Sequence, residues 1–290
     1  MWNPKPMVET PISEARIRTD DDLQLPEPPR WMLYAPDVAD RLFASESFRQ
    51  PSRSRRRPVA DPFSREWFEQ IERQRYSRPG HWIPRVLEFG RHAGETLLGL
   101  GDGLGTDWLQ YARHGARVIV CSRSPEQIDL IERNFRLRDC PGRFMLAPTR
   151  ALPIDSASID VVCIQGHVGF GADAGATIDE IYRVLRPGGK VIVVTRARYD
   201  AGYWHDRVFP WRRWWRRTQP PCDAATAREL RRDFGRFVDH VVKKRHLRRA
   251  QLPQLWRLFP LPVLERFLGQ YLILKAFKPV TAAFDLPAAA

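Results

Sequence analysis

The sequence has no long uninterrupted apolar run, and this excludes a helix that spans a membrane. None of its segments approaches the ~20 consecutive apolar residues that such a helix needs. The hydrophobic content of 43% is still sufficient for a core, so we expect a soluble globular protein. The N-terminus lacks the basic stretch followed by an apolar one that marks a secretory signal, which favours a cytoplasmic location.

Cysteine and lysine are both scarce. The four cysteines are widely spaced and form no C-x-x-C pair, which predicts reduced thiols packed in a core and no metal site. Only six of the 47 basic residues are lysines, so arginine carries most of the net charge of +13. A solvated basic surface explains this excess, and an anionic partner is the alternative. Nucleic acid is disfavoured as that partner, because the chain has no N-P-P-Y-type motif and no known RNA-binding module.

A glycine-rich turn between two predicted strands organises the rest of the chain. The strands are expected at 96–100 and 117–121, with a helix at 107–114 between them. Glycine occupies every second position of the turn, at Gly99, Gly101, Gly103 and Gly105. Glycine tolerates positive φ and lets a ligand approach the backbone, while the next helix directs its free N–H groups and positive dipole end at the turn. The turn therefore suits an anionic or carboxylate-bearing cofactor.

The spacing of the glycines distinguishes between cofactors. The dinucleotide pattern G-x-G-x-x-G would place its last glycine at Leu104 or Thr106, so it does not fit. The turn fits x-x-G-x-G-x-G instead. A second segment, EIYRVLRPGGKVIVV at 180–194, ends a helix at a proline and reverses through a glycine pair into a buried strand. Together the two segments resemble motif I and the E-x-x-R-V-L-K-P-G-G segment of class I S-adenosylmethionine-dependent methyltransferases. The resemblance is to the type 11-like group of quinone-biosynthesis and small-molecule enzymes.

This resemblance covers about 81–279 and implies an α/β fold. The family has a Rossmann-like, seven-stranded, mostly parallel sheet with helices on both faces. Further strands are expected at 143–147, 159–164, 190–195, 237–245 and 271–277, the last two antiparallel, and further helices at 64–76, 81–92, 124–135, 177–185 and 224–234. A disordered tail rich in proline and arginine is expected at 1–60, a linker helix at 61–80 and a second tail at 280–290.

The resemblance also implies S-adenosylmethionine as the cofactor, bound at the glycine turn and at the ends of the neighbouring strands. The predicted cofactor-binding residues are Gly99, Gly101, Asp102, Gly103, Gly105, Ser122, Arg123, Thr149 and Gln165. Three carboxylates of the family pattern are absent, and Gly99, Ser122 and Pro148 stand in their places. We expect Asp102 to take over the contact with the cofactor's ammonium group, and Ser122 with Arg123 to bond the ribose edge more weakly than a carboxylate.

Two other interpretations stay open beside a methyltransferase that acts on a small or lipid-like acceptor. The run Ser122-Arg123-Ser124 suits the 2′-phosphate of NADP, so a Rossmann-type oxidoreductase is one alternative. The missing acids also suit a methyltransferase fold without activity, kept as a binding or scaffold protein. The acceptor itself is not defined, because acceptor pockets are built from variable loops.

Two features of the sequence are predicted to act on the methyl acceptor. His167 follows the fourth strand at the carboxyl edge of the sheet, where ligands bind in open α/β folds, and it is the candidate general base. The insert at 199–222 is crowded with tryptophan and arginine. It is predicted to form either a lid for a lipophilic or aromatic acceptor, with reversible contact to an anionic membrane surface, or an amphipathic helix packed on the sheet.

Overall fold

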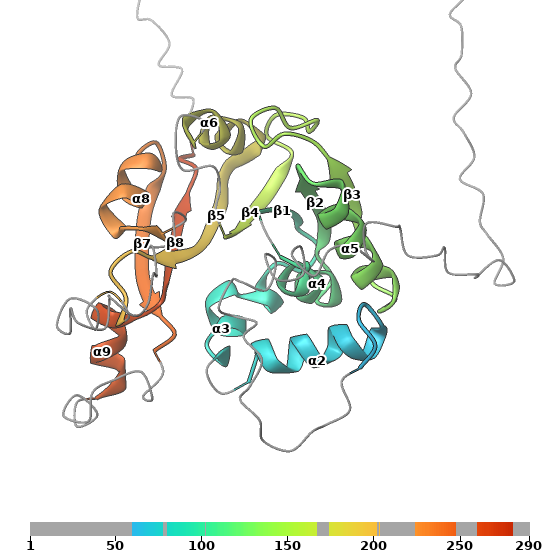
Figure 1. The fold of residues 1–290 in the computed structure, drawn as a ribbon. Coiled ribbons are helices and arrows are strands. Elements are labelled where there is room, and N and C mark those ends of the chain that lie inside the picture. Colours follow the sequence, from blue (N-terminus) through green and yellow to red (C-terminus); the bar gives the residue numbers. More distant parts are fainter. Residues whose placement is uncertain are drawn as a thin grey trace, which may run out of the picture.

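The computed structural model describes residues 60–77, 80–101, 103–166, 174–201, 203, 224–247 and 260–280. The predicted tails, apart from Ala60 and Val280, lie outside these residues, as do most of the insert, Asp102 and His167. In the described part, eight strands form a single sheet with helices on both sides (Figure 1). None of the helices in that part is long and apolar enough to cross a bilayer.

The main path of the sheet has the order β3-β2-β1-β4-β5-β8-β7. Its strands are β1 (Thr96–Gly101), β2 (Arg117–Ser122), β3 (Arg143–Leu146), β4 (Ile159–Gln165), β5 (Leu185–Ala197), β7 (Val238–Arg245) and β8 (Tyr271–Phe277). The first five pair in parallel, whereas β8 pairs antiparallel with both β5 and β7. A short additional strand, β6 (Ala224–Ala225), pairs with the end of β5. The predicted mostly parallel α/β sheet is confirmed, with this strand beyond the expected seven.

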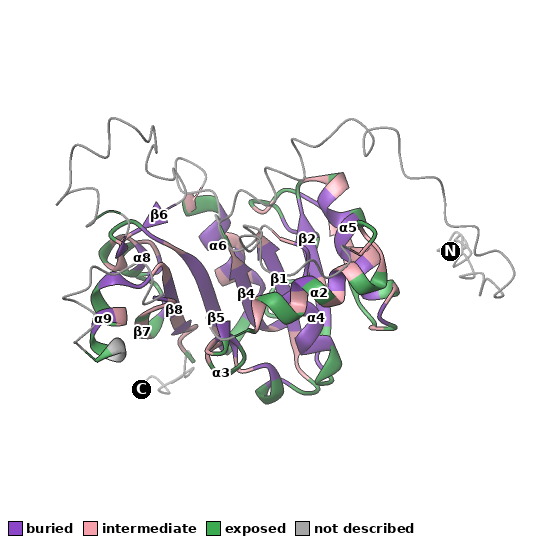
Figure 2. Ribbon diagram, turned by 60° about the horizontal axis from the view of Figure 1, so that its bottom comes forward, coloured by how far each residue is buried: buried purple, intermediate pink, exposed green. Residues whose placement is uncertain are grey.

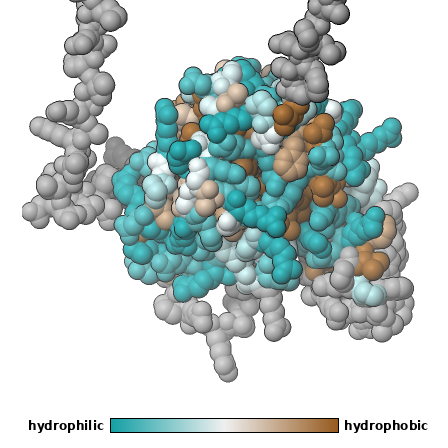
Figure 3. Space-filling model, turned by 180° about the vertical axis from the view of Figure 1, so that it is seen from behind, coloured by the Kyte–Doolittle hydropathy of each residue, from teal (hydrophilic) through white to brown (hydrophobic). Residues whose placement is uncertain are grey.

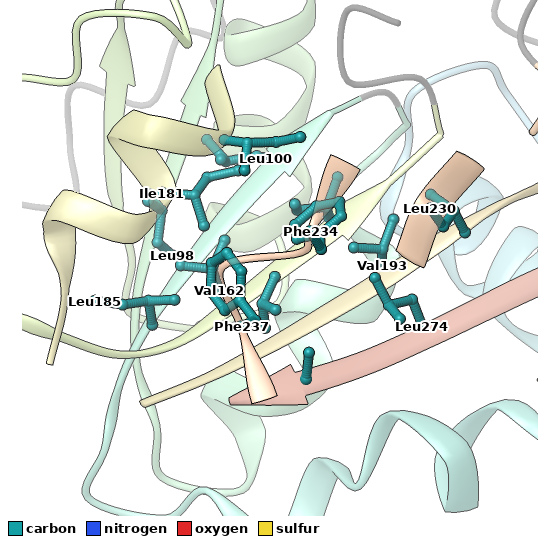
Figure 4. Close-up of a cluster of buried hydrophobic side chains, with 14 of the residues drawn as sticks. Leu98, Leu100, Val162, Ile181, Leu185, Val193, Leu230, Phe234, Phe237 and Leu274 are labelled. Carbon is teal, nitrogen blue, oxygen red and sulfur yellow. The ribbon is translucent and has the colours of Figure 1, made fainter. Parts of the chain in front are cut away.

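Two buried clusters cover the opposite faces of the sheet. Side chains alternate along β1, so that Leu98 joins one cluster and Leu97 the other. The first cluster packs against α6 (Ala174–Val184) and α8 (Ala227–Asp233), where Ile181 and Phe234 approach the strands (Figure 4). The second packs against α3 (Ile83–Leu87), α4 (Thr106–Arg113) and α5 (Pro125–Arg136). The central strands are consequently buried along most of their length (Figure 2).

The strand order reverses between β1 and β4, because β1 pairs with β2 on one side and with β4 on the other. In open parallel sheets, ligands bind beyond the carboxyl ends of the strands at such a switch point. Gly101 at the end of β1 lies in register with Gln165 at the end of β4. The switch point therefore predicts a ligand site above Gly101 and Gln165.

Helix α2 (Arg65–Arg75) lies beside α4 (Figures 1 and 2). It begins after Ser64, whose hydroxyl accepts a hydrogen bond from the backbone N–H of Trp67 at 3.2 Å. Its buried Phe68 and Ile71 pack with Leu104 of the glycine turn and with Leu130. The boundary predicted between a linker helix at 61–80 and the domain at 81–279 stays a prediction, but α2 packs directly on that domain.

The helix predicted at 81–92 was wrong in its extent. Helix α3 stops at Leu87 because Glu88 adopts a left-handed conformation, with φ of 61°, and a short 3₁₀ turn, η5 (Phe89–Arg91), follows. The Glu88 carboxylate is held there by Lys190 at 2.6 Å and Lys275 at 2.7 Å. These partners lie far away in the sequence, so local periodicity does not reveal the break.

The C-terminal half differs from the prediction in two further places. Strand β5 begins at Leu185, five residues earlier than expected, and the predicted turn is a bulge inside it between the pairs Ile159–Leu185 and Val161–Lys190. Helix α9 (Leu261–Leu268) was not predicted. It follows a proline and buries Leu264 and Leu268 in a small separate cluster.

Candidate active site

Two glycines of the turn are required by packing. Gly101 has φ of +107°, and a Cβ added there would collide with the carbonyl oxygen of Gln165. Gly105 has φ of +70°, and its Cβ would lie 2.7 Å from Cγ2 of Ile131. Neither position tolerates a side chain, because the backbone conformation and the neighbouring atoms both exclude one. These glycines hold the turn tightly against β4 and α5.

Gly103 differs from its neighbours because it faces open space. Its φ is +131°, yet no described residue other than its chain neighbours has an atom within 4 Å of a Cβ built there. The backbone conformation therefore favours glycine, while the space above is left free for a ligand to approach the main chain. Among the glycines of the turn, only Gly103 has this open space, which makes it the candidate ligand cradle.

Gly99 lies under the turn and has no room for a side chain. A Cβ at this position would lie 2.7 Å from Cδ2 of the Trp108 indole. The indole is almost fully buried, and its Nε1 donates to the carbonyl oxygen of Cys163 at 3.2 Å. Trp108 therefore fills the space in which the family's acidic side chain would begin.

Asp107, in the first turn of α4, is the buried carboxylate of the site, with its side chain 0% exposed. Its Oδ1 accepts from Arg75 Nε at 2.6 Å and from the Tyr76 hydroxyl at 2.7 Å. Its Oδ2 accepts from Gln165 Nε2 at 2.7 Å and from Arg75 Nη2. The start of a helix favours negative charge, and four donors compensate the desolvation of this carboxylate.

Arg75 stays charged in this environment. Burial alone lowers the pKa of Arg75, but the facing Asp107 carboxylate outweighs burial, so the pKa lies above its ordinary value. Asp107, Arg75 and Tyr76 were not predicted as site residues. The available signal was an aspartate in the first turn of the helix that follows the glycines.

Ser122 and Gln127 support the turn from the side of β2. The buried Ser122 hydroxyl donates to Gln127 Oε1 at 2.6 Å, and Gln127 Nε2 donates to the carbonyl oxygens of Gly101 at 3.2 Å and Gly103 at 3.3 Å. Ser124 caps α5, because its Oγ accepts from the backbone N–H of Gln127 at 3.2 Å. The Gln127 side chain thus fixes the conformation of the glycine turn.

The other predicted site residues lie in different surroundings. Arg123 is exposed beside Ser122, so it is free to reach a ligand, whereas Thr149 Oγ1 lies 3.2 Å from Thr177 Oγ1. Gln165 stands at the switch point, where its amide nitrogen bonds Asp107. Within the described residues, no three His, Cys, Asp or Glu side chains gather as they would around a metal ion. Ligand contacts of Ser122, Arg123, Thr149 and Gln165 stay predictions.

Comparison with known proteins agrees with this geometry. Residues 97–193 match the family model described as a methyltransferase domain. The malonyl-[acyl-carrier protein] O-methyltransferase of Serratia marcescens is 31% identical over 114 residues, which cover 39% of this chain and 43% of that protein. The demethylmenaquinone methyltransferase of Clavibacter sepedonicus is 32% identical over 101 residues, covering 35% and 41%. Less than half the length of these relatives is therefore matched.

Solved structures show the same fold. The geranyl diphosphate C-methyltransferase of Streptomyces coelicolor A3(2), in complex with Mg²⁺, geranyl diphosphate and S-adenosyl-L-homocysteine, superimposes with a TM-score of 0.51 at 19% identity. The match covers 76% of this chain and 85% of that one. The family model identifies residues 97–193 as a methyltransferase domain, and the superposition shows that the fold of the described region is that of a class I S-adenosylmethionine-dependent enzyme, which confirms the resemblance seen in the sequence. S-adenosylmethionine is the cofactor of that class.

The residues present fit such a cofactor in part. Open space above Gly103 and the ionised Arg75–Asp107 pair at the switch point suit a ligand with a charged amino-acid end. The family's carboxylates are absent at Gly99 and Ser122. The Trp108 indole occupies the space beside Gly99, and the Ser122 hydroxyl is engaged by Gln127. Cofactor binding therefore has to depend on other groups of this chain than the acids of the family pattern.

Proposed function

We propose that this protein transfers a methyl group from S-adenosylmethionine to a small or lipid-like acceptor. The open backbone at Gly103, at the sheet's switch point and inside a methyltransferase domain, is the observation that carries the proposal. The acceptor class is suggested by relatives named for malonyl-[acyl-carrier protein] and demethylmenaquinone.

The contribution of the chain to this reaction is mainly alignment. The cofactor, when bound, supplies the electrophilic methyl group. Gln127 donates to two carbonyl oxygens of the turn, which restrains the cradle at Gly103 before any ligand arrives. Alignment of two reactants in a preorganised site can supply ~7–11 kcal/mol of the barrier reduction. His167, which lies outside the described residues, stays the candidate general base for an acceptor that must lose a proton.

A lipid-like acceptor accords with the surface beside the insert. Helix α9 exposes 52% of Val263 and 62% of Phe267, and Arg266 between them is also exposed. Lys244 Nζ donates to the carbonyl oxygens of Tyr199 at 2.8 Å and Phe267 at 3.0 Å, which ties α9 to the start of the insert. Apolar side chains also gather on one side of the molecule when it is seen from behind (Figure 3). We propose that α9 and the insert together make reversible contact with an anionic membrane surface.

Calorimetric titration with S-adenosylhomocysteine tests the proposed function. Gly103→Ala places a Cβ in the cradle, so we expect it to weaken binding at least about tenfold. Gly94→Ala is the matched control, because Gly94 also has positive φ, of +79°, and open space around it, but precedes β1 at the opposite end of that strand. Absence of binding by the wild-type protein at millimolar ligand would favour the scaffold alternative, and binding of NADP instead would favour the oxidoreductase.

A further inference from the structure

We infer that Arg75 receives the carboxylate at the methionine end of the cofactor, and that Asp107 holds Arg75 in place for this contact. This inference rests on the proposed function, because it requires an S-adenosylmethionine site at the glycine turn. It adds a ligand-binding residue from α2, a helix that precedes in the sequence the residues that match the family model.

The position of the pair is the first argument. Asp107 follows the glycine turn, and Gln165, which bonds Asp107, ends β4 in register with Gly101. Arg75 therefore lies beside the carboxyl ends of β1 and β4. If the ribose lies at the end of β2, beside Ser122 and Arg123, the other end of the cofactor passes Gly103 toward β4 and reaches Arg75.

The hydrogen bonds of Arg75 are the second argument. A guanidinium carries five N–H donors, and here Nε and Nη2 are used on the two oxygens of Asp107. Nη1 makes no hydrogen bond to another described residue, and 19% of the side chain is exposed. Tyr76 and Gln165 prevent Asp107 from turning, so the remaining donors of Arg75 are held in a fixed direction. Such a fork is well suited to a second carboxylate.

The docking of α2 does not explain the pair. Phe68 and Ile71 already bury the helix against the domain, and Glu72, one turn before Tyr76, is paired with Arg113 at 2.9 Å and with Arg138. Desolvation of two charges is costly, and buried ion pairs often add little to stability compared with apolar residues of similar size. An ionised pair at the end of a helix that is docked by other contacts therefore points to a ligand.

The test compares two ligands that differ only in the carboxylate, S-adenosylmethionine and decarboxylated S-adenosylmethionine, by calorimetric titration of the full chain. For Arg75→Met we expect roughly 10- to 100-fold weaker binding of S-adenosylmethionine, the usual range for a charge-assisted contact, and at most about a twofold change for the decarboxylated form. Arg73→Met is the matched control on the same helix, because the Arg73 side chain is exposed, and it should leave both affinities unchanged.

A second variant guards against misfolding, because Arg75→Met leaves Asp107 buried without its cation. The double variant Arg75→Met/Asp107→Asn removes both charges, so it should recover thermal stability. Like Arg75→Met alone, it should bind S-adenosylmethionine more weakly than the wild type and bind the decarboxylated form almost as well. Equal weakening of both ligands, or no change for either, would overturn the inference and leave the proposed function standing. No binding of S-adenosylmethionine by the wild-type protein would overturn both.

Discussion

The indole of Trp108 lies directly against the Cα of Gly99, so that a Cβ at position 99 would be only 2.7 Å from the ring. Restoring the family's acid by Gly99→Asp therefore forces a charged side chain into a filled, buried space. We expect it to destabilise the protein by roughly 3 kcal/mol or more, through overpacking and an unpaired charge, without tighter binding of S-adenosylmethionine. Chemical denaturation measures the first effect and calorimetry the second.

The control for this substitution is Gly90→Asp, because a Cβ at Gly90 meets its nearest atom at an ordinary 3.6 Å. In a double-mutant cycle, Trp108→Ala should relieve part of the damage, so Gly99→Asp should cost less in that background. Strict additivity of the two changes would contradict the packing relationship.

Gln127 joins Ser122 to the glycine turn, and its removal should loosen the cradle. Gln127→Ala leaves the Ser122 hydroxyl and the carbonyl oxygens of Gly101 and Gly103 without these bonds. We expect a loss of about 1–3 kcal/mol in unfolding free energy together with weaker S-adenosylhomocysteine binding. Ser124→Ala removes the cap of the same helix, so it should cost about 1 kcal/mol but leave the affinity intact. Equal affinities for all three proteins would show that the turn is rigid without Gln127.

Glu88 predicts a specific loss of stability in acid. Burial alone raises the pKa of Glu88, but hydrogen bonds and charges from Lys190 and Lys275 outweigh it and lower the pKa to about 2. A carboxyl group with a lower pKa when folded stabilises the protein above its unfolded value and loses this contribution as the pH falls through the folded one. The contribution of Glu88 is therefore present at neutral pH and disappears between about pH 4.5 and 2.

The variant Glu88→Gln should reduce unfolding free energy at pH 7 by on the order of 1 kcal/mol, allowing for solvent screening, and should flatten the pH profile in that window. Glu132→Gln is the control, since Glu132 forms an exposed pair with Arg136 on the surface of α5. An unchanged acid profile for Glu88→Gln would refute the assignment. Urea titrations at several pH values provide the measurement.

Membrane contact through α9 can be tested by flotation with liposomes. Phe267→Ser removes the more exposed apolar side chain of this helix, and we expect it to reduce recovery with anionic vesicles several-fold. Val241→Ser, at an exposed position of β7, is the control and should float like the wild-type protein. Neutral vesicles should recover less of every variant, because arginine accompanies the apolar residues. Equal recovery of wild type with and without anionic lipid would exclude the charge-dependent contact.

The parts of the fold that depend on local signals were predictable. Ser124 caps α5, and Gly115, with φ of +87°, follows the end of α4, as their residue types favour. The two sequence segments that resemble the family lie on β1 with the turn after it and on α6 with β5. Alternation and helical periodicity identify such elements because each buries one face against the same sheet.

The contacts that shape the site were not predictable, because they join distant residues. Asp107 meets Arg75 and Gln165 only after folding, and nothing in the spacing pairs them. The Gln127 side chain could bond the backbone N–H of Ser124, the cap of its own helix, or the carbonyl oxygens of the glycine turn. In the folded protein it bonds the turn, a contact that depends on tertiary packing. The same holds for Glu88, whose left-handed backbone depends on two lysines from β5 and β8.

The adjacent Asp107 and Trp108 bear on how divergent members of this fold are judged. A search that scores only the acid at the end of the first strand would class this chain as having lost its cofactor site, since Gly99 stands in that place. The helix that follows carries a buried negative charge and, in the next residue, the ring that occupies the vacated volume. Should this chain bind S-adenosylmethionine, loss of an acid from the strand would be no sufficient sign of a defunct enzyme, and the first helical turn of such a homologue would have to be inspected before it is discarded.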